Sequence, residues 1–337
     1  MKTKFINSPE NLTAELLEGF TMAFKNQVKL ASENIIVRTE AKSDDKVAII
    51  AFGGSGHEPA VSGFVGQGML DCSVVGDIFA APGAQRVFQA LQMFNRPAGI
   101  LLLVLNHSGD VMSGNMAMQL AQRSGITVKS IMTHDDISAG LDTPDDDRRG
   151  LAGAVAMYKV LGAAAEEGKS LDELLEIGER LNQNIATLAV AMKSCTHPQN
   201  GATITELPEG QMQIGMGQHG EAGANGSEPL VSADATALFM AKQIILKLNI
   251  TKGDKIALYI NGVGATTVME QLVVFRAVAK HLETLEVEIV DGYAGEMLTV
   301  QEQAGFQMIM AKLDADHVDY MVNHSANAPY WSRHAVK

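Results

Sequence analysis

Two histidines enclosed by glycines are the residues of this chain best suited to chemistry. His57 lies in Ala-Phe-Gly-Gly-Ser-Gly-His-Glu-Pro at residues 51–59, and His219 lies in Gly-Met-Gly-Gln-His-Gly-Glu-Ala-Gly at residues 215–223. A neutral imidazole is a nucleophile and proton carrier near pH 7, and glycine lets the backbone close around a small ligand. The pattern predicts two ligand-binding loops, although either loop alone could be a turn that carries a surface histidine.

A third candidate is an aspartate in residues 105–110, Leu-Asn-His-Ser-Gly-Asp, which follow the most apolar predicted strand. At a strand exit, Asp110 is well placed to act as a general base or to anchor a ligand. Asp110 could also cap a helix that starts near Met112. One aspartate can do both, so we keep both interpretations.

The apolar pattern predicts strands that alternate with helices. In the first half, we expect strands at 47–51, 72–75, 100–105 and 126–131, and helices after Ser8 and at 85–94, 112–123, 149–167 and 171–184. In the second half, we expect strands at 211–216, 255–260, 286–290 and 306–311, and helices at 233–247 and 266–281.

This alternation predicts two α/β domains, each a central sheet flanked by helices, at residues 1–185 and 186–337. The turn-rich segment 196–210 is the candidate inter-domain region. Open α/β sheets bind ligands at the carboxyl ends of their strands, where the loops with His57 and Asp110 begin.

Composition excludes several classes of protein. The 337 residues are 46% apolar and carry a net charge of −13 without a basic run, so direct nucleic-acid binding is not expected. The longest apolar stretch, 98–105, is too short to cross a bilayer, and residues 1–5 lack a signal-peptide pattern. Cys72 and Cys195 lack metal-site spacing and indicate buried structural thiols. We therefore expect a cytoplasmic protein without a membrane segment or a metal site.

Two segments imitate known motifs without matching them. Residues 162–170 resemble a P-loop but have one residue too many between the glycines, and we expect a helix end there followed by an N-cap at Ser170. Residues 142–147 resemble a calcium loop but lack its glycine and final glutamate, and indicate a solvated acidic loop.

The remaining sequence supplies no nucleotide or ligand signature. No Gly-x-Gly-x-x-Gly opens a βαβ unit with a downstream ribose-binding acid, which argues against an NAD-dependent dehydrogenase, and no Walker motif is found. Three later histidines have no helical ligand spacing and are expected at the surface: His317, His324 and His334.

Six motifs, in order, resemble the dihydroxyacetone-binding subunit of dihydroxyacetone kinases. They span nearly the whole chain, from about Leu12 to Lys312, and are residues 53–59, 76–82, 148–153, 219–221, 261–266 and 304–306. One such motif alone would be weak, whereas six in the family's order make the resemblance specific.

The resemblance implies a mechanism. His219 matches the family histidine that adds to the ketone carbon to form a hemiaminal, so that glycerol, which has no carbonyl, is rejected. Asp110 matches the carboxylate that hydrogen-bonds the substrate and accepts a hydroxyl proton, and His57 matches a second acid/base histidine. Gly53 and Gly54 match the backbone that closes over the ligand.

The resemblance also implies partners. Subunits of this kind are homodimers without their own cofactor, and a separate helical subunit carries ADP or ATP with Mg²⁺. In phosphotransferase-linked systems, a further phosphoryl-carrier subunit recharges that nucleotide. The chain length fits the stand-alone binding subunit.

Seven positions depart from the family pattern. Leu105 and His107 replace a lysine and a tyrosine, Ser113-Gly114 replaces Asn-Phe, and Phe52 replaces a glycine. In addition, Ala81 replaces a serine and Ala222 replaces a proline. With Leu105 in place of the lysine, the chain lacks a cation that could stabilise the substrate. Phe52 is expected to crowd the path of the backbone that a glycine would leave open.

Because the nucleophile and base remain in a changed surrounding, two functions stay open. One is a substrate-binding kinase subunit for dihydroxyacetone or a close four-carbon ketose, which is slightly favoured. The other is a ketone-sensing coactivator that works through a transcription factor.

Overall fold

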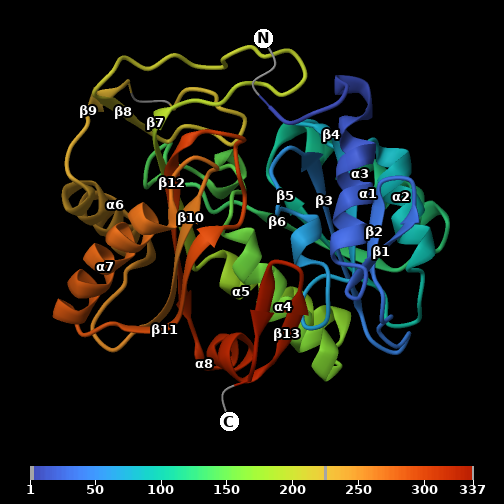
Figure 1. The fold of residues 1–337 in the computed structure, drawn as a ribbon. Coiled ribbons are helices and arrows are strands. Elements are labelled where there is room, and N and C mark those ends of the chain that lie inside the picture. The colour runs from blue at the N-terminus through green and yellow to red at the C-terminus, as the bar shows by residue number, and fades with distance from the viewer. Residues whose placement is uncertain (1–3, 224–225, 336–337) are drawn as a thin grey trace.

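The computed structural model describes residues 4–223 and 226–335, which form two six-stranded mixed sheets flanked by helices (Figure 1). The predicted class, two α/β domains, is confirmed. The first sheet has the strand order β1-β2-β4-β3-β5-β6, and the second has the order β11-β10-β12-β7-β8-β9.

The first sheet is built from strands of the first 133 residues. They are β1 (Val28–Ser32), β2 (Ile35–Arg38), β3 (Ala48–Ser55), β4 (Cys72–Ile78), β5 (Ile100–Leu105) and β6 (Val128–Thr133). The pairs β3–β4, β3–β5 and β5–β6 are parallel. All six residues of β5 are buried, as expected for a central parallel strand covered on both faces.

The second sheet contains one parallel pair, β10–β11. Its strands are β7 (Ile185–Lys193), β8 (Gln211–Ile214), β9 (Glu228–Pro229), β10 (Lys255–Gly262), β11 (Glu288–Glu296) and β12 (Ala304–Leu313). A separate hairpin near the C-terminus consists of β13 (Ala326–Ala328) and β14 (Trp331–Arg333).

Helices cover and separate the sheets. They are α1 (Leu12–Ala23), α2 (Ala84–Met93), α3 (Ser108–Arg123), α4 (Ala154–Glu167), α5 (Leu171–Asn182), α6 (Ala233–Leu248), α7 (Val268–Thr284) and α8 (Ala315–Val318). Single helical turns are η1 (Pro9–Asn11), η2 (Ser62–Phe64), η3 (Asp145–Asp147) and the π-helical η4 (Asp319–Asn323).

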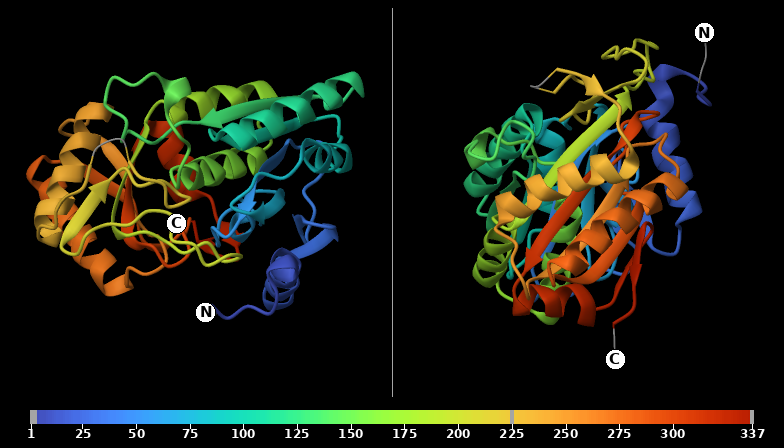
Figure 2. Two further views of the ribbon diagram at one scale, coloured as in Figure 1. Left: turned by 90° about the horizontal axis from the view of Figure 1, so that it is seen from above. Right: turned by 90° about the vertical axis from the view of Figure 1, so that its left-hand side faces the viewer.

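Figures 1 and 2 show how these helices are layered. Helices α6 and α7 pack on the outer face of the second sheet, and α2 and α3 pack on the outer face of the first. Helix α4 lies between the sheets, in one core cluster with residues of both, such as Ile49 and Ile309. Gly162 of α4 makes this packing close, because a Cβ there would lie 2.5 Å from the Cα of Met69.

Several local predictions are confirmed. Gly168, at φ +100°, ends α4, and the Ser170 side chain begins α5 in a capping box with Glu173, so residues 162–170 are no P-loop. Cys72 and Cys195 are both buried free thiols. In the part of the chain that the structure describes, no helix is long and apolar enough to cross a membrane.

The predicted inter-domain segment is wrong. Residues 196–210 join β7 to β8, which are neighbours in the second sheet. The sequence patterns did not predict β1, β2, β7 or the C-terminal hairpin. For β7, the reason is that its nearly unbroken apolar run follows α5 without a strong turn signal. A turn-rich composition marks a loop but does not reveal which elements that loop connects.

The prediction that His317 lies at the surface is also wrong, because only 1% of it is exposed. Its Nε2 donates to the carbonyl oxygen of Ile177 on α5, at 3.0 Å. The short helix α8, which is capped by Asp314, carries this ring and places it against α5. His334 is exposed and His324 is half-buried.

Candidate functional site

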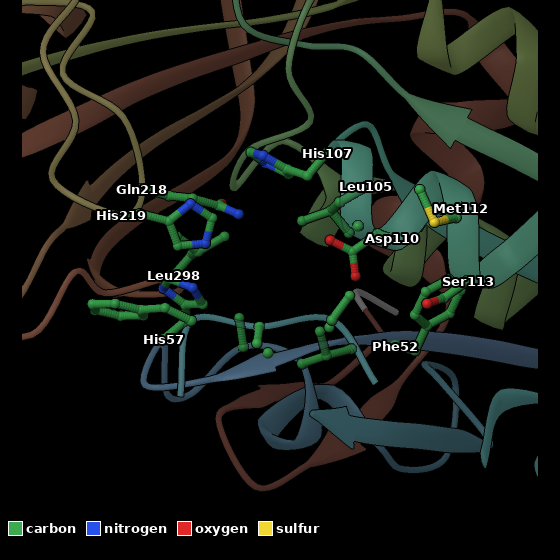
Figure 3. Close-up of a pocket in the computed structure, with 18 residues that line it drawn as sticks. Phe52, His57, Leu105, His107, Asp110, Met112, Ser113, Gln218, His219 and Leu298 are labelled. Atoms are coloured by element: carbon green, nitrogen blue, oxygen red, sulfur yellow. The ribbon is translucent and has the colours of Figure 1, made fainter. Parts of the chain in front are cut away.

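The three predicted reactive side chains line one cavity of about 390 Å³ (Figure 3). His57 follows β3 and Asp110 follows β5, so both lie at the carboxyl end of the parallel strands. His219 reaches the same cavity from the loop after β8 in the second half, and Gly53 and Gly54 also line it. The two histidine loops, which lie in different halves of the chain, therefore converge on one cavity.

His57 is buried and held by the second half of the chain. Its Nδ1 lies 2.9 Å from the carbonyl oxygen of Thr299, which can only accept, so Nδ1 carries the proton. Its Nε2 is therefore an unprotonated acceptor, and it is buried without a hydrogen-bond partner among the described residues. Burial, with the nearby His219, lowers the pKa of His57 to about 3, so the ring is neutral at pH 7.

His219 is half-buried among aromatic rings. Its ring centroid lies 5.1 Å from that of His57, 5.7 Å from that of His107 and 5.5 Å from that of Phe79. Its backbone N–H donates to Oε2 of Glu221 at 2.9 Å. Burial lowers the pKa of His219, which favours the neutral, nucleophilic imidazole.

Asp110 is a buried carboxyl in the first turn of α3. The helix begins at Ser108, earlier than the predicted start near Met112, and no side-chain cap bond is made by its N-cap residue His107. Oδ1 of Asp110 is buried without a hydrogen-bond partner in the described structure. Burial raises the pKa of Asp110 to about 7. A carboxyl with that pKa is well matched to general base catalysis near neutral pH.

Sequence reasoning overlooked His107 as a site residue. Its ring lines the cavity, and Nε2 donates to the carbonyl oxygen of Gly150 at 2.8 Å, which leaves Nδ1 as an acceptor. Burial lowers the pKa of His107 to about 4. Its place in the same strand-exit loop as Asp110 was the signal that could have revealed it.

Phe79 is a second residue that was overlooked. It adopts φ +58° and stacks on His57 with the ring centroids 4.9 Å apart. A bulky residue in the left-handed region is strained, and such strain is found where surrounding structure holds it for a function. Its position in the family-like segment 76–82 was the available signal.

Phe52 and Leu105, two of the residues that depart from the family pattern, are both buried where they line the cavity. Phe52 is fully buried and its ring lies against Gly114 of α3, so it fills a space that a larger residue at 114 would occupy. Leu105 is buried and lies beside Asp110 in Figure 3. The pocket end that holds the Asp110 carboxyl is therefore mostly apolar.

Among residues 4–223 and 226–335, no group of three or more histidine, cysteine, aspartate or glutamate side chains is arranged to hold a metal ion. The three histidine rings at the cavity, His57, His107 and His219, all have a lowered pKa, so each is neutral and carries a lone pair on one ring nitrogen at pH 7.

The Dak1 domain family matches residues 18–330, and the chain belongs to this family. It is 35% identical over 311 residues to the dihydroxyacetone-binding subunit DhaK of PTS-dependent dihydroxyacetone kinase 1 from Listeria innocua, with 92% of this chain and 94% of that protein covered. The DhaK subunit of Lactococcus lactis is 33% identical, with 97% and 98% covered. Among solved structures, the dihydroxyacetone kinase operon co-activator Dha-DhaQ superposes with a TM-score of 0.89 at 30% identity, with 95% and 98% covered.

Proposed function

We propose that this chain binds dihydroxyacetone, or a closely related short ketose, covalently as a hemiaminal at His219. The observation that carries the proposal is the convergence of a neutral His219, the unprotonated Nε2 of His57 and the Asp110 carboxyl on one cavity. These groups match the needs of a ketone that carries hydroxyls on both sides of its carbonyl.

The proposed chemistry balances without a cofactor. A ring nitrogen of His219 donates its lone pair to the carbonyl carbon while the C=O π electrons move to oxygen. The imidazole loses the proton from its other nitrogen, and the oxygen gains one, so the adduct contains the whole ketone. His57 and Asp110 accept hydrogen bonds from ligand hydroxyls, and Asp110 takes the proton from the hydroxyl that will react.

In this proposal, the bound ketose is presented to a separate subunit that holds ADP or ATP with Mg²⁺. A fixed ligand gives the orientation that in-line phosphoryl transfer requires. The similarity to DhaK subunits of PTS-dependent kinases supports a nucleotide-bearing partner and a phosphoryl-carrier protein. As the family resemblance implies, the chain in this proposal works as a homodimer in the cytoplasm.

A second candidate is a ketone-sensing coactivator that acts through a transcription factor. The likeness to the co-activator Dha-DhaQ favours it, as do Leu105 and His107, which change the surrounding of Asp110 and His219. Capture of the ketone would then alter the surface offered to the regulator.

Intact-mass measurement under gentle, non-acidic conditions tests the covalent step. Dihydroxyacetone should add its full mass without loss of water, whereas a lysine Schiff base would lose water. His219→Ala should abolish the adduct, and the exposed control variant His334→Ala should retain it. A ligand-occupied crystal with an unmodified His219 would disprove the hemiaminal.

Reconstitution with a nucleotide-bearing subunit and a phosphoryl donor separates the two functions. Turnover of dihydroxyacetone at a rate typical of kinases would establish the catalytic role and remove the main support for the coactivator. Adduct formation without turnover would favour the coactivator.

A further inference from the structure

We propose that Arg149 is a positioning residue that, together with Glu221, holds the His219 loop against the first sheet and balances the charge around the imidazole. This inference rests on the proposed role of His219 as the nucleophile. Arg149 does not line the cavity itself and would act through its contacts.

The guanidinium of Arg149 joins the two halves of the chain. It precedes α4, and its Nε donates to Oδ2 of Asp136, which follows β6, at 2.7 Å. On the opposite side, Nη2 donates to the carbonyl oxygen of Gly215 at 2.9 Å and Nη1 donates to Oε1 of Glu221 at 2.9 Å. Gly215 and Glu221 flank His219 in the sequence, so one planar group fixes both sides of the nucleophile's loop.

Glu221 passes this constraint to the nucleophile. While Oε1 accepts from Arg149, Oε2 accepts from the backbone N–H of His219 at 2.9 Å. The backbone oxygen of Glu221 accepts from the N–H of Gly217, also at 2.9 Å. A Cβ at Gly217 would lie 2.5 Å from Nη1 of Arg149, so the ion pair is packed directly on the loop backbone.

The same pair sets the charge near the imidazole. After burial, which lowers the pKa of His219, the Glu221 carboxylate raises it and the Arg149 cation lowers it. Without Arg149, the carboxylate of Glu221 would act on His219 uncompensated and favour imidazolium, which cannot attack a carbonyl. Other titratable groups near His219 are the rings of His57 and His107, Cys195, whose Sγ contacts the backbone oxygen of His219, and, across the cavity, Asp110.

The bonding pattern distinguishes this role from a simple surface ion pair. Arg149 is about one quarter exposed, and its partner Asp136 is buried. A lysine could replace the charge but could not span Asp136, Gly215 and Glu221 with one rigid planar group. Replacing Arg149 by lysine therefore separates the effect of its charge from the effect of its bridging hydrogen bonds.

Four variants test the proposal: Arg149→Met, Arg149→Lys, Glu221→Gln and the double variant Arg149→Met/Glu221→Gln. NMR titration of labelled histidines gives the pKa of His219, and intact-mass kinetics give the pH profile of adduct formation. Arg149→Met should raise the pKa of His219 and move the adduct profile to higher pH, and Glu221→Gln should lower that pKa. The double variant should return the pKa toward the wild-type value while still forming the adduct several-fold more slowly.

Arg149→Lys should keep the pKa near wild type but slow adduct formation several-fold, because the loop loses its bridging contacts. This variant keeps the test decisive if Arg149→Met does not fold. The control is Arg180→Met on α5, which breaks ion pairs with Glu176, Asp314 and Asp316 and should leave both readouts unchanged.

A wild-type pKa and adduct rate in Arg149→Met would overturn the proposal. A wild-type protein that forms no adduct would refute the hemiaminal instead, while the titration of His219 in the variants would still report on the Arg149–Glu221 pair.

Discussion

The ring of Phe52 on β3 lies against Gly114 on α3, so closely that a Cβ at position 114 would be 3.1 Å from Cζ of Phe52. Phe52 is fully buried and lines the candidate site beside Asp110. The resemblance described above implies glycine at the first position and phenylalanine at the second. We therefore expect one ring to occupy this strand–helix contact in the family, and in this chain the strand supplies that ring.

This relationship predicts compensation between positions 52 and 114. Phe52→Gly should lose about 3–5 kcal/mol of unfolding free energy through the cavity it creates, and Gly114→Phe should be destabilised by overpacking. The double variant should be more stable than the sum of the single effects predicts, with a coupling of roughly 1–3 kcal/mol. Urea denaturation of all four proteins measures this coupling, and purely additive losses would show that the two positions are independent.

Asp110→Asn should stabilise the fold at alkaline pH while weakening ligand binding. The folded-state pKa of Asp110 is about 7 against an ordinary 3.8, so the native state binds more protons between these values and the carboxyl costs stability as pH rises. The variant should gain up to about 4 kcal/mol over wild type at pH 8, and the gain should vanish near pH 4. Denaturation curves at both pH values check this, and a loss of stability at pH 8 would show that the carboxylate is favourably held.

Ligand affinity should depend on the same group. If the ionised Asp110 accepts a ligand hydroxyl, affinity for dihydroxyacetone should fall as pH drops below about 7. Leu105→Lys places a cation beside this carboxyl and should lower its pKa, which moves the fall in affinity to lower pH. Calorimetric titration from pH 5 to 8 measures the affinity for dihydroxyacetone at each pH, with Leu105→Met as the uncharged control. If affinity depends on pH in the same way in both variants, Asp110 is not the group whose ionisation controls binding.

The Leu105→Lys change also bears on turnover. If the wild-type protein binds the ketose but a kinase partner does not phosphorylate that ketose, the added cation should recover part of the activity. Because Phe52 now packs on Gly114, the glycine at position 52 should be restored only together with phenylalanine at 114. If the triple variant Leu105→Lys/Phe52→Gly/Gly114→Phe still fails to turn over the ketose, these three positions do not explain the missing activity.

Two helix glycines should respond oppositely to alanine. Gly162→Ala in α4 should lose about 1–3 kcal/mol, because the new Cβ would lie 2.5 Å from backbone atoms of Met69. The control Gly19→Ala in α1 has nothing within 4 Å of its new Cβ and should gain about 0.5–1 kcal/mol from helix propensity. Equal changes in the two variants would mean that α4 can shift between the sheets at little cost.

Local sequence determined the parts of this protein that depend on neighbouring residues. The buried parallel strands β3 and β5 were predictable from their apolar runs, and so were the loops at their ends that carry His57 and Asp110. The end of α4 at Gly168 and the cap at Ser170 were equally local, because both follow from backbone conformation and one side-chain bond. The glycine-rich loop at residues 215–223 likewise marked His219 as a candidate, and the family resemblance added its expected role as the nucleophile.

Only the tertiary structure decided how these parts meet. The proton on His57 is located by the carbonyl of Thr299, 242 residues away, and His219 is held through Arg149 from the other half of the chain. The partner of Phe52 is Gly114 across a strand–helix contact, and β7 enters the middle of the second sheet. Such contacts depend on packing between distant segments, and burial, which is known only after folding, raises the pKa of Asp110 and lowers that of His57.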